Sequence, residues 1–231
     1  MNLAAAEPAW PAVFAIHPRK TVVAPALVAA FRGLATSLIS DCMGRNIGAL
    51  GLRAYHVSAS LCGPALTVRV RPGDNLMIHK AIEMAEPGDV IVVDGSGDLT
   101  QALVGGIMRA QMIRRGIAGI VVNGAIRDVA EWQNREFPAF ALGHVHRGPS
   151  KDGPGEINVS ISCAGLLVAP GDLVVGDADG VVAIPADEVE RMLPLVLVRK
   201  QHEERIRASI AAGLFEPERI NSILRDKGCP D

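Results

Sequence analysis

The chain has 231 residues, of which 23 are Lys or Arg and 25 are Asp or Glu, so its formal net charge is −2. A near-neutral charge and an aromatic content of 3% exclude general nucleic-acid binding, which needs a basic surface or many stacking side chains. Hydrophobic residues at 49% and charged residues at 21% exclude a disordered chain and predict a globular protein. A chain of this length can bury its core in one domain, so we expect a single domain over residues 1–231.

No segment predicts a membrane or exported protein. The longest apolar runs, such as Leu193–Val198, are far shorter than the roughly 18 residues of a membrane-spanning helix. Residues 1–18 carry no Lys or Arg ahead of an apolar core, so no signal peptide is expected. The four cysteines are far apart and form no Cys-x-x-Cys pair, which favours buried free thiols in a reducing compartment. We therefore expect a cytoplasmic protein that does not bind membranes.

The first half of the chain predicts an α/β core preceded by an N-terminal arm over about residues 1–20. Alternating apolar residues predict a strand over 65–70, and helical spacing predicts a helix over 75–85. A strand, a helix and a second strand are then expected at 90–93, from Gly97 to about Arg115, and at 117–122. Such a unit requires parallel strands joined by a right-handed crossover.

The second half predicts a loop, short strands and a long C-terminal helix. Residues 143–155 are rich in Gly, Pro, Ser and charge, which predicts a loop, and a strand is expected at 157–161. Asp179-Gly180 between two apolar runs is a strong hairpin signal. A helix from about residue 187 to Gly213, with Pro194 as a point where it can kink, would extend about 39 Å. This C-terminal arm (187–231) is long enough to reach a neighbouring subunit.

Three patterns that suggest other sites are weak. Gly95-Ser96-Gly97 follows a strand but lacks the next glycine and the acidic residue of a dinucleotide-binding motif, so we interpret it as a turn. His144 and His146 would share one strand face, but without a third ligand they do not predict a metal centre. The segment 177–180 lacks the Glu spacing of a calcium loop, and the hairpin explains it better.

Gly105 and Gly106 form the first candidate site. Inside a helix each glycine would cost about 1 kcal/mol relative to alanine, so the pair is better placed where a helix begins. The free N–H groups of residues 105–108 would then point outward, with no Cβ to block the first two. Such a terminus can bind a small carboxylate. Close packing of the helix against its neighbour explains the glycines equally well, and both explanations stay open.

Arg127 and Asp128 form the second candidate site, because they follow a predicted buried strand that ends at Val122-Asn123. In open α/β folds, ligands bind at the carboxyl ends of the strands. Asp128 could hold a hard divalent cation, and Arg127 could bind a carboxylate or stabilise a developing alkoxide. Alternatively, Asp128 caps a helix that begins at Val129, while Arg127 makes a surface ion pair.

Together these segments resemble the RraA-like superfamily, which includes the class II aldolases for 4-hydroxy-4-methyl-2-oxoglutarate and 4-carboxy-4-hydroxy-2-oxoadipate. The resemblance extends from about Ser40 to Gly213. It depends first on the segment that begins at Gly105 and on Arg127-Asp128, which follows 22 residues later. The further matching segments are Pro72–His79, Gly153–Val159 and Pro170–Val181.

The resemblance implies an α/β sandwich similar to the swivelling phosphohistidine domain, with a long C-terminal helix. It also implies a ring-shaped homotrimer or homohexamer whose active sites lie between subunits. The implied activity is a metal-dependent lyase that cleaves a small 4-hydroxy-2-oxo acid, such as 4-hydroxy-4-methyl-2-oxoglutarate, and releases pyruvate. Oxaloacetate decarboxylation is an expected side activity because it passes through the same enolate. The alternatives are a non-catalytic protein-binding ring, such as the ribonuclease inhibitor of this superfamily, and a lyase or hydratase for a different oxo acid.

The resemblance also implies roles for individual residues. Arg127 would contact the oxygens of the substrate. Asp128 would bind Mg²⁺ or Mn²⁺, largely through water, and the cation would act as a Lewis acid. A base would come from the long helix of the adjacent subunit, where Glu203, or failing that Glu204, matches the position. The carboxylate of pyruvate would be held by the N–H groups of Gly105, Gly106, Ile107 and Met108.

Two positions differ from the usual pattern of these aldolases. Their first glycine is usually followed by Asp or Glu, where this chain has Gly106, and Asn123 stands where Asp is frequent. The missing acidic side chain would orient water around the cation, so its absence lowers the expected metal affinity and turnover. Asp98, which lies upstream, is a candidate to compensate.

Overall fold

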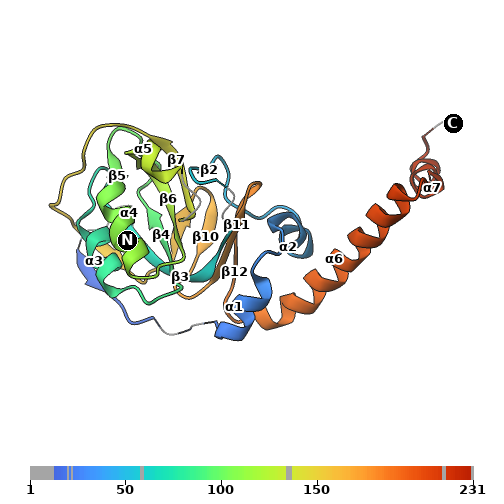
Figure 1. Cartoon of the computed structure of the whole chain (residues 1–231), viewed down its shortest axis with the longest axis horizontal. Helices are drawn as coiled ribbons and strands as arrows, with labels where there is room; N and C mark the ends of the chain where they lie inside the picture. The colour runs from blue at the N-terminus through green and yellow to red at the C-terminus, as the bar shows by residue number, and fades with distance from the viewer. Residues whose placement is uncertain are drawn as a thin grey trace, which may run out of the picture. The chain divides into compact units, whose positions relative to one another are not determined.

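The computed structural model describes residues 13–19, 21, 23–57, 60–133, 137–214 and 217–229. The chain divides into two compact units, residues 1–193 and 194–231, and the boundary falls inside helix α6. Figure 1 labels the helices and strands by which the two units are described below. Within the described ranges, no helix is both long and apolar enough to cross a lipid bilayer.

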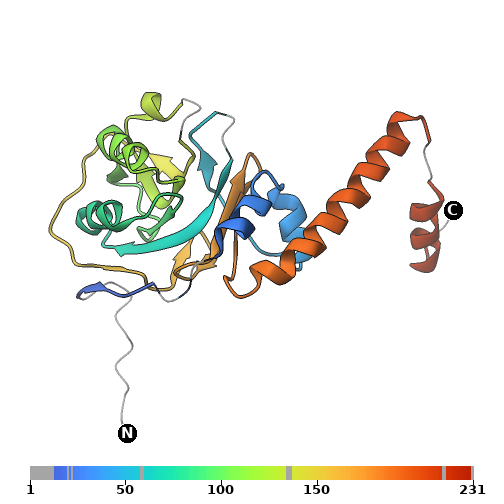
Figure 2. The same ribbon diagram turned by 60° about the horizontal axis from the view of Figure 1, so that its bottom comes forward.

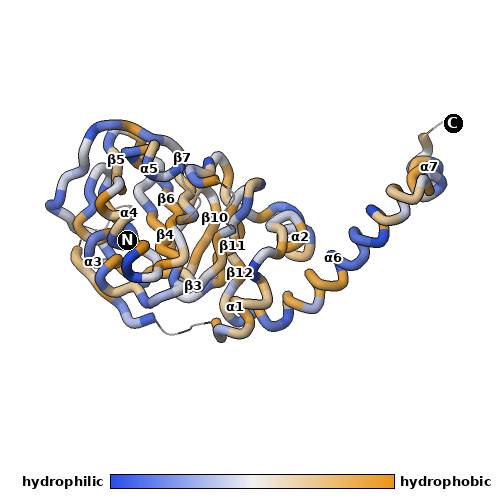
Figure 3. The backbone as a smooth tube through the Cα atoms, in the orientation of Figure 1, coloured by the Kyte–Doolittle hydropathy of each residue, from blue (hydrophilic) through white to orange (hydrophobic). Residues whose placement is uncertain are grey.

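The first unit is built on a mixed sheet whose main strands follow the order β1-β8-β3-β4-β6-β7-β2. At its centre β3, β4, β6 and β7 are parallel to one another. β4 and β6 are rich in Val and Ile, and β3, β4 and β6 are almost entirely buried, as expected of parallel strands that are covered on both faces. Figure 3 shows β4 and β6 as hydrophobic segments. Their bounds are β3 Leu61–Val70, β4 Val90–Asp94, β6 Gly119–Ile126 and β7 Ala139–His144.

Shorter strands extend the sheet. β1 pairs in parallel with β8, and β8 pairs antiparallel with β3. β11 and β12 form a hairpin, and β11 also pairs antiparallel with β3. β9 and β10 form a separate two-stranded sheet. The bounds are β1 Phe14–Ile16, β2 Arg53–Ala54, β5 Ala102–Val104, β8 Gly155–Ile157, β9 Ile161–Cys163, β10 Leu166–Val168, β11 Leu173–Asp177 and β12 Gly180–Ile184.

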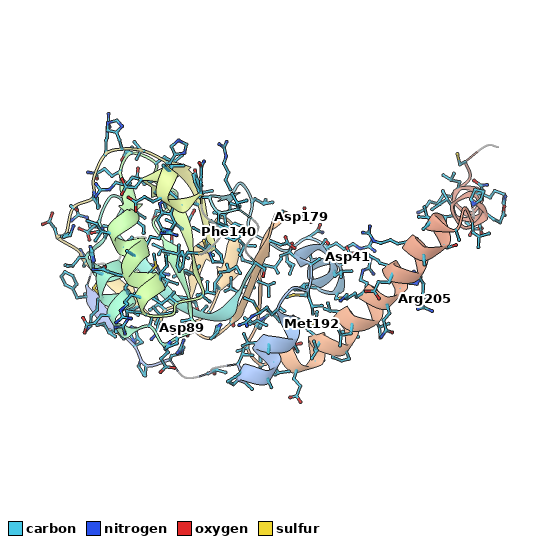
Figure 4. The ribbon with its side chains drawn as sticks, viewed as in Figure 1. Asp41, Asp89, Phe140, Asp179, Met192 and Arg205 are labelled. Carbon is cyan, nitrogen blue, oxygen red and sulfur yellow. The ribbon has the colours of Figure 1, made fainter. Side chains whose placement is uncertain are left out.

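Helices cover one face of the central strands, and short strands cover the other. α3 (Leu76–Met84) and α4 (Gly106–Arg114) bury Ile78 and Met112 in one hydrophobic cluster with side chains of β3, β4 and β6. Figure 2 shows β3 running along the sheet below α3. On the opposite face Phe140, labelled in Figure 4, belongs to a second cluster with residues of β9 and β10. Each fully buried side chain of this size contributes about 1.5–3 kcal/mol to folding, so both faces stabilise the sandwich.

Polar contacts connect the remaining segments of this unit to the sheet. Asp177 at the end of β11 accepts hydrogen bonds from the backbone N–H (2.8 Å) and the hydroxyl (2.7 Å) of Thr36, and so caps α2. Arg19 forms a 2.6 Å ion pair with the buried Asp89, which lies just before β4 and is labelled in Figure 4. The remaining helices of this unit are α1 (Pro25–Phe31), α2 (Thr36–Cys42) and α5 (Val129–Trp132).

The second unit contains most of α6 (Val189–Ala211) and all of α7 (Glu218–Asp226). The long C-terminal helix that the sequence predicts is confirmed as α6, which begins at residue 189 and continues through Pro194. Its end is followed by Gly213 with a φ of 75°, a conformation that suits a glycine after a helix. Residues 1–12 and Lys20 of the predicted N-terminal arm lie outside the described residues, and the described part contains β1.

Several predicted elements are confirmed, and four need correction. The predicted strand at 65–70 lies within β3, the predicted helix at 75–85 matches α3, and the β11–β12 hairpin is present. The predicted helix from Gly97 is wrong at its start, because β5 intervenes and α4 begins at Gly106, as the argument from the glycine pair indicates. The short run Ala102–Val104 is buried and pairs with β6, a contact that no local periodicity indicates.

The predicted end of the next strand at Val122-Asn123 is also wrong, because β6 continues to Ile126. Gly124 lets the strand pass beside β5, where a Cβ atom would come within 3.0 Å of the Leu103 side chain. The predicted strand at 157–161 is split into β8 and β9, because Asn158 has a φ of 60° and leaves the extended conformation. The predicted loop at 143–155 begins later, since β7 continues to residue 144.

The cysteines differ in burial. Cys62 and Cys163 are buried, and burial raises the pKa of Cys62 to about 11 and that of Cys163 to about 12. Both thiols are therefore protonated at neutral pH. Cys42 is half-buried and Cys229 is exposed, so the expectation of buried thiols holds for only two of the four.

Candidate functional site

Two chain segments meet at one edge of the sheet to form the candidate site. β5 pairs in parallel with β6, and Val104 at the end of β5 lies opposite Ile126 at the end of β6. The N–H of Arg127 donates a 2.9 Å hydrogen bond to the carbonyl oxygen of Val104. Because the strands end side by side (Figure 1), Gly105 and Arg127 come together although they are 22 positions apart in the sequence.

The first turn of α4 meets the carboxylate of Asp128. Oδ2 of Asp128 accepts a 2.8 Å hydrogen bond from the backbone N–H of Gly106, one of the N–H groups that a helix leaves unpaired at its start. A Cβ atom on Gly105 would lie 2.5 Å from this oxygen and 2.9 Å from Nε of Arg127. A side chain at position 105 would displace both charged groups. The first glycine is therefore explained by the close approach of Asp128 and Arg127, and not by packing of another helix.

The start of α4 thus binds a carboxylate, as the sequence predicts, but this carboxylate belongs to the chain itself. The prediction was four free N–H groups at residues 105–108, whereas the N–H of Gly106 is bonded to Asp128. Among the side chains of this segment, Met108 is buried and Ile107 is exposed. A substrate carboxylate would reach the N–H of Gly106 only after the Asp128 side chain rotates away.

Asp128 stands at the capping position of α5, but its side chain makes no capping hydrogen bond to that helix. Its backbone has φ 61° and ψ 43°, in the left-handed region that Asp adopts more readily than most residues. Its carboxylate bonds to α4 instead. The alternative in which Asp128 serves only as the cap of its own helix is therefore not what the structure shows.

The Arg127–Asp128 pair has a fixed backbone and accessible charges. Nε of Arg127 lies 3.6 Å from Oδ2 of Asp128, and the two side chains are 39% and 41% exposed. The indole N–H of the fully buried Trp132 donates a 2.7 Å hydrogen bond to the carbonyl oxygen of Arg127. The buried indole holds the turn in place, while both charged groups stay within reach of a ligand.

A cavity of about 220 Å³ opens beside this pair. The cationic side chains of Arg127 and Lys151 both line it, so the cavity suits a small anion better than a cation. Its mostly apolar wall includes Asn75, His79 and Leu103. Mostly apolar walls with a few polar groups are typical of small-molecule sites.

A buried carboxylate holds the loop that carries Lys151. Burial raises the pKa of Asp74, but four hydrogen bonds outweigh this effect and leave the pKa below its ordinary range. Asp74 is therefore ionised at neutral pH and fixes the loop over the start of α3. Its carboxylate accepts these bonds from the hydroxyl of Ser150 (2.7 Å) and from the N–H groups of Leu76 (2.9 Å), Asp152 (2.6 Å) and Gly153 (3.0 Å).

His79 adds a neutral group to the same cavity. Its partial burial and the positive charge of Lys151 both lower the pKa of His79, so the imidazole is uncharged at neutral pH. Sequence reasoning singled out neither residue as part of the site. His79 and Asn75 lie in the segment Pro72–His79 that carries part of the resemblance, which is the one signal that could have identified them. Lys151 lies in a loop whose sequence indicates no partner.

Sequence reasoning also missed an acidic side chain beside Gly106. Glu131 lies in α5, three residues after Asp128. A Cβ atom on Gly106 would overlap both carboxylate oxygens of Glu131, so this carboxylate occupies the space that a side chain at position 106 would take. Asp98, which the sequence suggested as the compensating acid, accepts hydrogen bonds from the N–H and the hydroxyl of Thr100 instead.

The remaining candidate residues have other contacts. The amide of Asn123 donates a 3.3 Å hydrogen bond to Asp94. Nδ1 of His144 lies 3.1 Å from the hydroxyl of Tyr55. Glu203 is on α6 in the second unit, where its carboxylate lies 3.9 Å from the guanidinium of Arg207. Its predicted role at the site of a neighbouring subunit stays a prediction.

The donors at the site fit a hard cation that keeps most of its water. The described ranges contain no group of three or more His, Cys, Asp or Glu side chains that could enclose a metal ion. The site offers the half-exposed carboxylate of Asp128 and, over the same turn of α4, that of Glu131. Mg²⁺ is usually held by one or two carboxylates and several waters, and Mn²⁺ also favours oxygen ligands. The two carboxylates are therefore compatible with either ion.

Comparisons with known proteins identify the family to which the chain is similar. Residues 36–183 match the family model described as RraA-like: Aldolase/RraA. A protein of Halalkalibacterium halodurans named as a provisional 4-hydroxy-4-methyl-2-oxoglutarate aldolase is 42% identical over 75% of this chain and 83% of its own. The 4-hydroxy-4-methyl-2-oxoglutarate aldolase of Thermus thermophilus is 35% identical over 58% of this chain and 80% of its own.

A solved structure is similar across most of the chain. The Streptomyces coelicolor protein RraAS2, described as an unusual member of the RNase ES inhibitor RraA protein family, has a TM-score of 0.74 and 27% identity. The match covers 80% of this chain and 98% of that protein. The predicted α/β fold with a long C-terminal helix is confirmed by this likeness and by α6.

Proposed function

Because this chain belongs to the RraA-like family, we propose that it is a divalent-metal-dependent aldolase that cleaves a 4-hydroxy-2-oxo acid and releases pyruvate. One observation carries the proposal: Asp128 bonds to the first turn of α4 and lies 3.6 Å from Arg127, which lines the adjacent cavity together with Lys151. The names of the two aldolase relatives support the same reaction class.

The residues of the site match what the reaction demands. The C3–C4 bond breaks, the C4 hydroxyl loses its proton and becomes a carbonyl, and C3 keeps the electron pair as the enolate of pyruvate. The N–H groups at the start of α4 would bind the C1 carboxylate. The Arg127 guanidinium would stabilise the negative charge that develops on the C2 oxygen. A proton added at C3 completes pyruvate.

Asp128 would hold the divalent cation, with Mg²⁺ or Mn²⁺ as the ion and water as its other ligands. The ion would supply Lewis acidity at the 2-oxo group, which favours the enolate. Rotation of Asp128 away from Gly106 would free one N–H group for the substrate. Oxaloacetate decarboxylation is proposed as a side activity because loss of CO₂ forms the same enolate.

The base and the assembly are part of the proposal. We expect a homotrimer or homohexamer in which Glu203, or Glu204 beside it, enters the site of the neighbouring subunit and takes the proton of the C4 hydroxyl. Both residues lie on α6, which is 23 residues long and so about 35 Å in length. The cytoplasm as location stays a prediction from the cysteine spacing.

A panel of 2-oxo acids tests this proposal, with 4-hydroxy-4-methyl-2-oxoglutarate and oxaloacetate assayed with Mg²⁺, Mn²⁺ or EDTA. Pyruvate release is followed by a coupled assay. We expect release that EDTA abolishes and that Asp128→Ala reduces to background, while Asp98→Ala, a carboxylate engaged with Thr100, keeps wild-type turnover. Metal-dependent turnover that Asp128→Ala leaves unchanged would overturn the mechanism.

A non-catalytic, protein-binding ring is the second candidate. One observation favours it: position 106 is Gly, so the acidic side chain that usually follows the first glycine in these aldolases is missing. The description of RraAS2 as a member of an RNase inhibitor family points the same way for that relative. Capture of a stoichiometric protein partner, together with no metal-stimulated activity on any acid of the panel, would support this candidate.

A further inference from the structure

We infer that a second cavity beside Arg127 and Asp128 binds the half of the substrate that leaves when the C3–C4 bond breaks, and that His144 donates a hydrogen bond to a carboxylate on that half. His144 would then be a specificity-determining residue, because it distinguishes acids that carry a carboxylate on C4 from acids that do not. The inference rests on the proposed function, since it concerns the same substrate and the same arginine.

The second cavity has a volume of about 280 Å³. Arg127 lines both this cavity and the first one, the cavity of about 220 Å³ that Lys151 also lines. Gly105 at the start of α4 lines the first cavity, whereas Asp128 lines the second. A substrate with its C1 carboxylate at the start of α4 and its C2 oxygen at Arg127 would extend its C4 half past Arg127 into the second cavity. The other residues that line the second cavity are Val129, His144, Val145 and His146.

The pairing of β6 with β7 holds His144 next to Arg127. His144 is the last residue of β7 and lies opposite Ile126, and the N–H of Val145 donates a 3.0 Å hydrogen bond to the carbonyl oxygen of Ile126. A Cβ atom on Gly148 would lie 3.0 Å from Nη1 of Arg127, so the guanidinium lies against the segment that follows His144. The imidazole and the guanidinium therefore come from neighbouring strand ends that are joined by backbone hydrogen bonds.

Tyr55 determines which nitrogen of His144 faces a ligand. Nδ1 of His144 lies 3.1 Å from the hydroxyl oxygen of Tyr55, and the two rings meet edge to face at 5.8 Å. Burial raises the pKa of Tyr55, so the hydroxyl keeps its proton at neutral pH. Among the residues that the structure describes, Nδ1 is the one acceptor for this proton, which places the proton of the uncharged imidazole on Nε2. A charged imidazole also has a proton on Nε2, so this atom of the exposed His144 is a donor in either state.

These groups suit a carboxylate. The carboxylate of Asp128 is already bonded to the N–H of Gly106 and lies 3.6 Å from Arg127, which partly offsets its charge. A carboxylate on C4 would gain the Nε2–H of His144 and the positive field of the guanidinium. A hydrogen bond to a charged group changes affinity about tenfold or more. A C4 half without a carboxylate would leave this donor to water and gain nothing from it.

Binding of two acids that cannot be cleaved, because they lack the C4 hydroxyl, tests the inference on the purified full chain with Mg²⁺ present. 2-Oxoglutarate carries the second carboxylate, and 2-oxopentanoate does not. We expect calorimetric titration to show that His144→Phe weakens 2-oxoglutarate binding about tenfold or more and leaves 2-oxopentanoate binding unchanged. Tyr55→Phe should weaken 2-oxoglutarate binding less, because the imidazole proton is then free to move to Nδ1. His17→Phe, at an exposed histidine that lines neither cavity, is the matched control and should have no effect.

The outcomes separate the two proposals. If the wild type releases pyruvate from 4-hydroxy-4-methyl-2-oxoglutarate but His144→Phe binds 2-oxoglutarate as tightly as the wild type, the role of His144 is wrong and the proposed function survives. Loss of the preference for 2-oxoglutarate in Lys151→Ala, but not in His144→Phe, would place the second carboxylate in the first cavity and also overturn the inference. An equal loss for both acids in His144→Phe would show a structural role only. A preference that depends on His144 in a protein that releases no pyruvate would overturn the aldolase and leave the second cavity as a carboxylate site.

Discussion

Two helices on the helix-covered face of the sheet, α3 and α4, each begin beside an aspartate. The two aspartates differ in burial and in the number of hydrogen bonds that they accept. Asp74 at the start of α3 is fully buried and accepts four hydrogen bonds. Asp128 at the start of α4 is 41% exposed, accepts one backbone hydrogen bond and has a guanidinium 3.6 Å away. A buried carboxylate whose bonds are all made holds a loop in place, whereas an exposed one with unused acceptor capacity can take a ligand.

The largest effect is expected from Gly105→Ala, which should displace the exposed aspartate, Asp128. The new methyl group would come within 2.5 Å of Asp128 Oδ2 and 2.9 Å of Arg127 Nε, so both charged groups must move. We expect kcat/KM for pyruvate release to fall about 100-fold, because small displacements of reacting groups cost that much. Steady-state kinetics with the coupled assay measures it.

A control substitution to alanine away from the site is Gly33→Ala, since no atom lies within 4 Å of a Cβ at position 33, and it should leave kcat/KM unchanged. Gly33 has a φ of 80°, so alanine there tests backbone strain without any steric contact at the site. A Gly105→Ala protein with wild-type kinetics would show that Asp128 and Arg127 need not lie where the structure places them.

Asp74→Asn should disrupt the hydrogen bonds of the buried aspartate. An amide offers one acceptor oxygen in place of two and no charge, so some of the four donors lose their partner. We expect the free energy of unfolding to fall by about 2 kcal/mol, a roughly 30-fold change in the folding equilibrium. Urea denaturation measures this loss. Asp98→Asn, at a carboxylate bonded to Thr100 alone, should change stability by less than about 0.5 kcal/mol, and equal losses in both variants would contradict the role given to Asp74.

The pH dependence of stability should sharpen the same distinction. The folded state lowers the pKa of Asp74, so the unfolded chain binds a proton more readily and stability rises with pH in this range. The contribution of Asp74 is complete above the ordinary aspartate pKa of about 3.9 and is lost as pH falls through the lower folded-state pKa. The stability difference between the wild type and Asp74→Asn should therefore shrink on acidification, as urea midpoints at several pH values would show. A difference that grows at low pH would contradict this assignment.

The smallest effect is expected in the cavity that Arg127, Lys151 and His79 line. The positive charge of Lys151 helps to lower the pKa of His79, so Lys151→Ala should raise that pKa towards its ordinary value. Burial of the imidazole remains in the variant, so the recovery should be partial. Titration of the imidazole by nuclear magnetic resonance measures it. An unchanged pKa would mean that the loop held by Asp74 does not keep Lys151 near His79.

Local patterns predicted much of the fold and two parts of the site, the glycine pair and the Arg127–Asp128 pair. The sequence placed the Arg127–Asp128 pair after a buried strand and the glycine pair at the start of a helix, and in the structure each pair follows a strand of the sheet. Sequence reasoning placed the strands incorrectly for two reasons. The three residues of β5 are too few to show a periodicity, and Gly124 interrupts the apolar pattern within β6.

Contacts between distant segments could not be predicted in the same way. The orientation of the Asp128 carboxylate depends on a left-handed backbone at that residue, which the sequence does not specify. The loop held by Asp74 brings Lys151 to the cavity across 76 positions from Asp74 to Ser150. Sequence reasoning missed Glu131 as a site residue. Its carboxylate lies against Gly106 only because α4 and α5 pack together, and no local pattern indicates that packing.

The pairing of β5 with β6 also decides which changes in chain length the protein can tolerate. The ends of the two strands are joined directly by backbone hydrogen bonds. This pairing, and not the 22-residue separation in sequence, therefore sets the distance between Gly105 and Arg127. The connection between them turns at the exposed Arg115 and Gly116. Extra residues inserted at that turn, or new chain ends opened there, would leave both halves of the site in register.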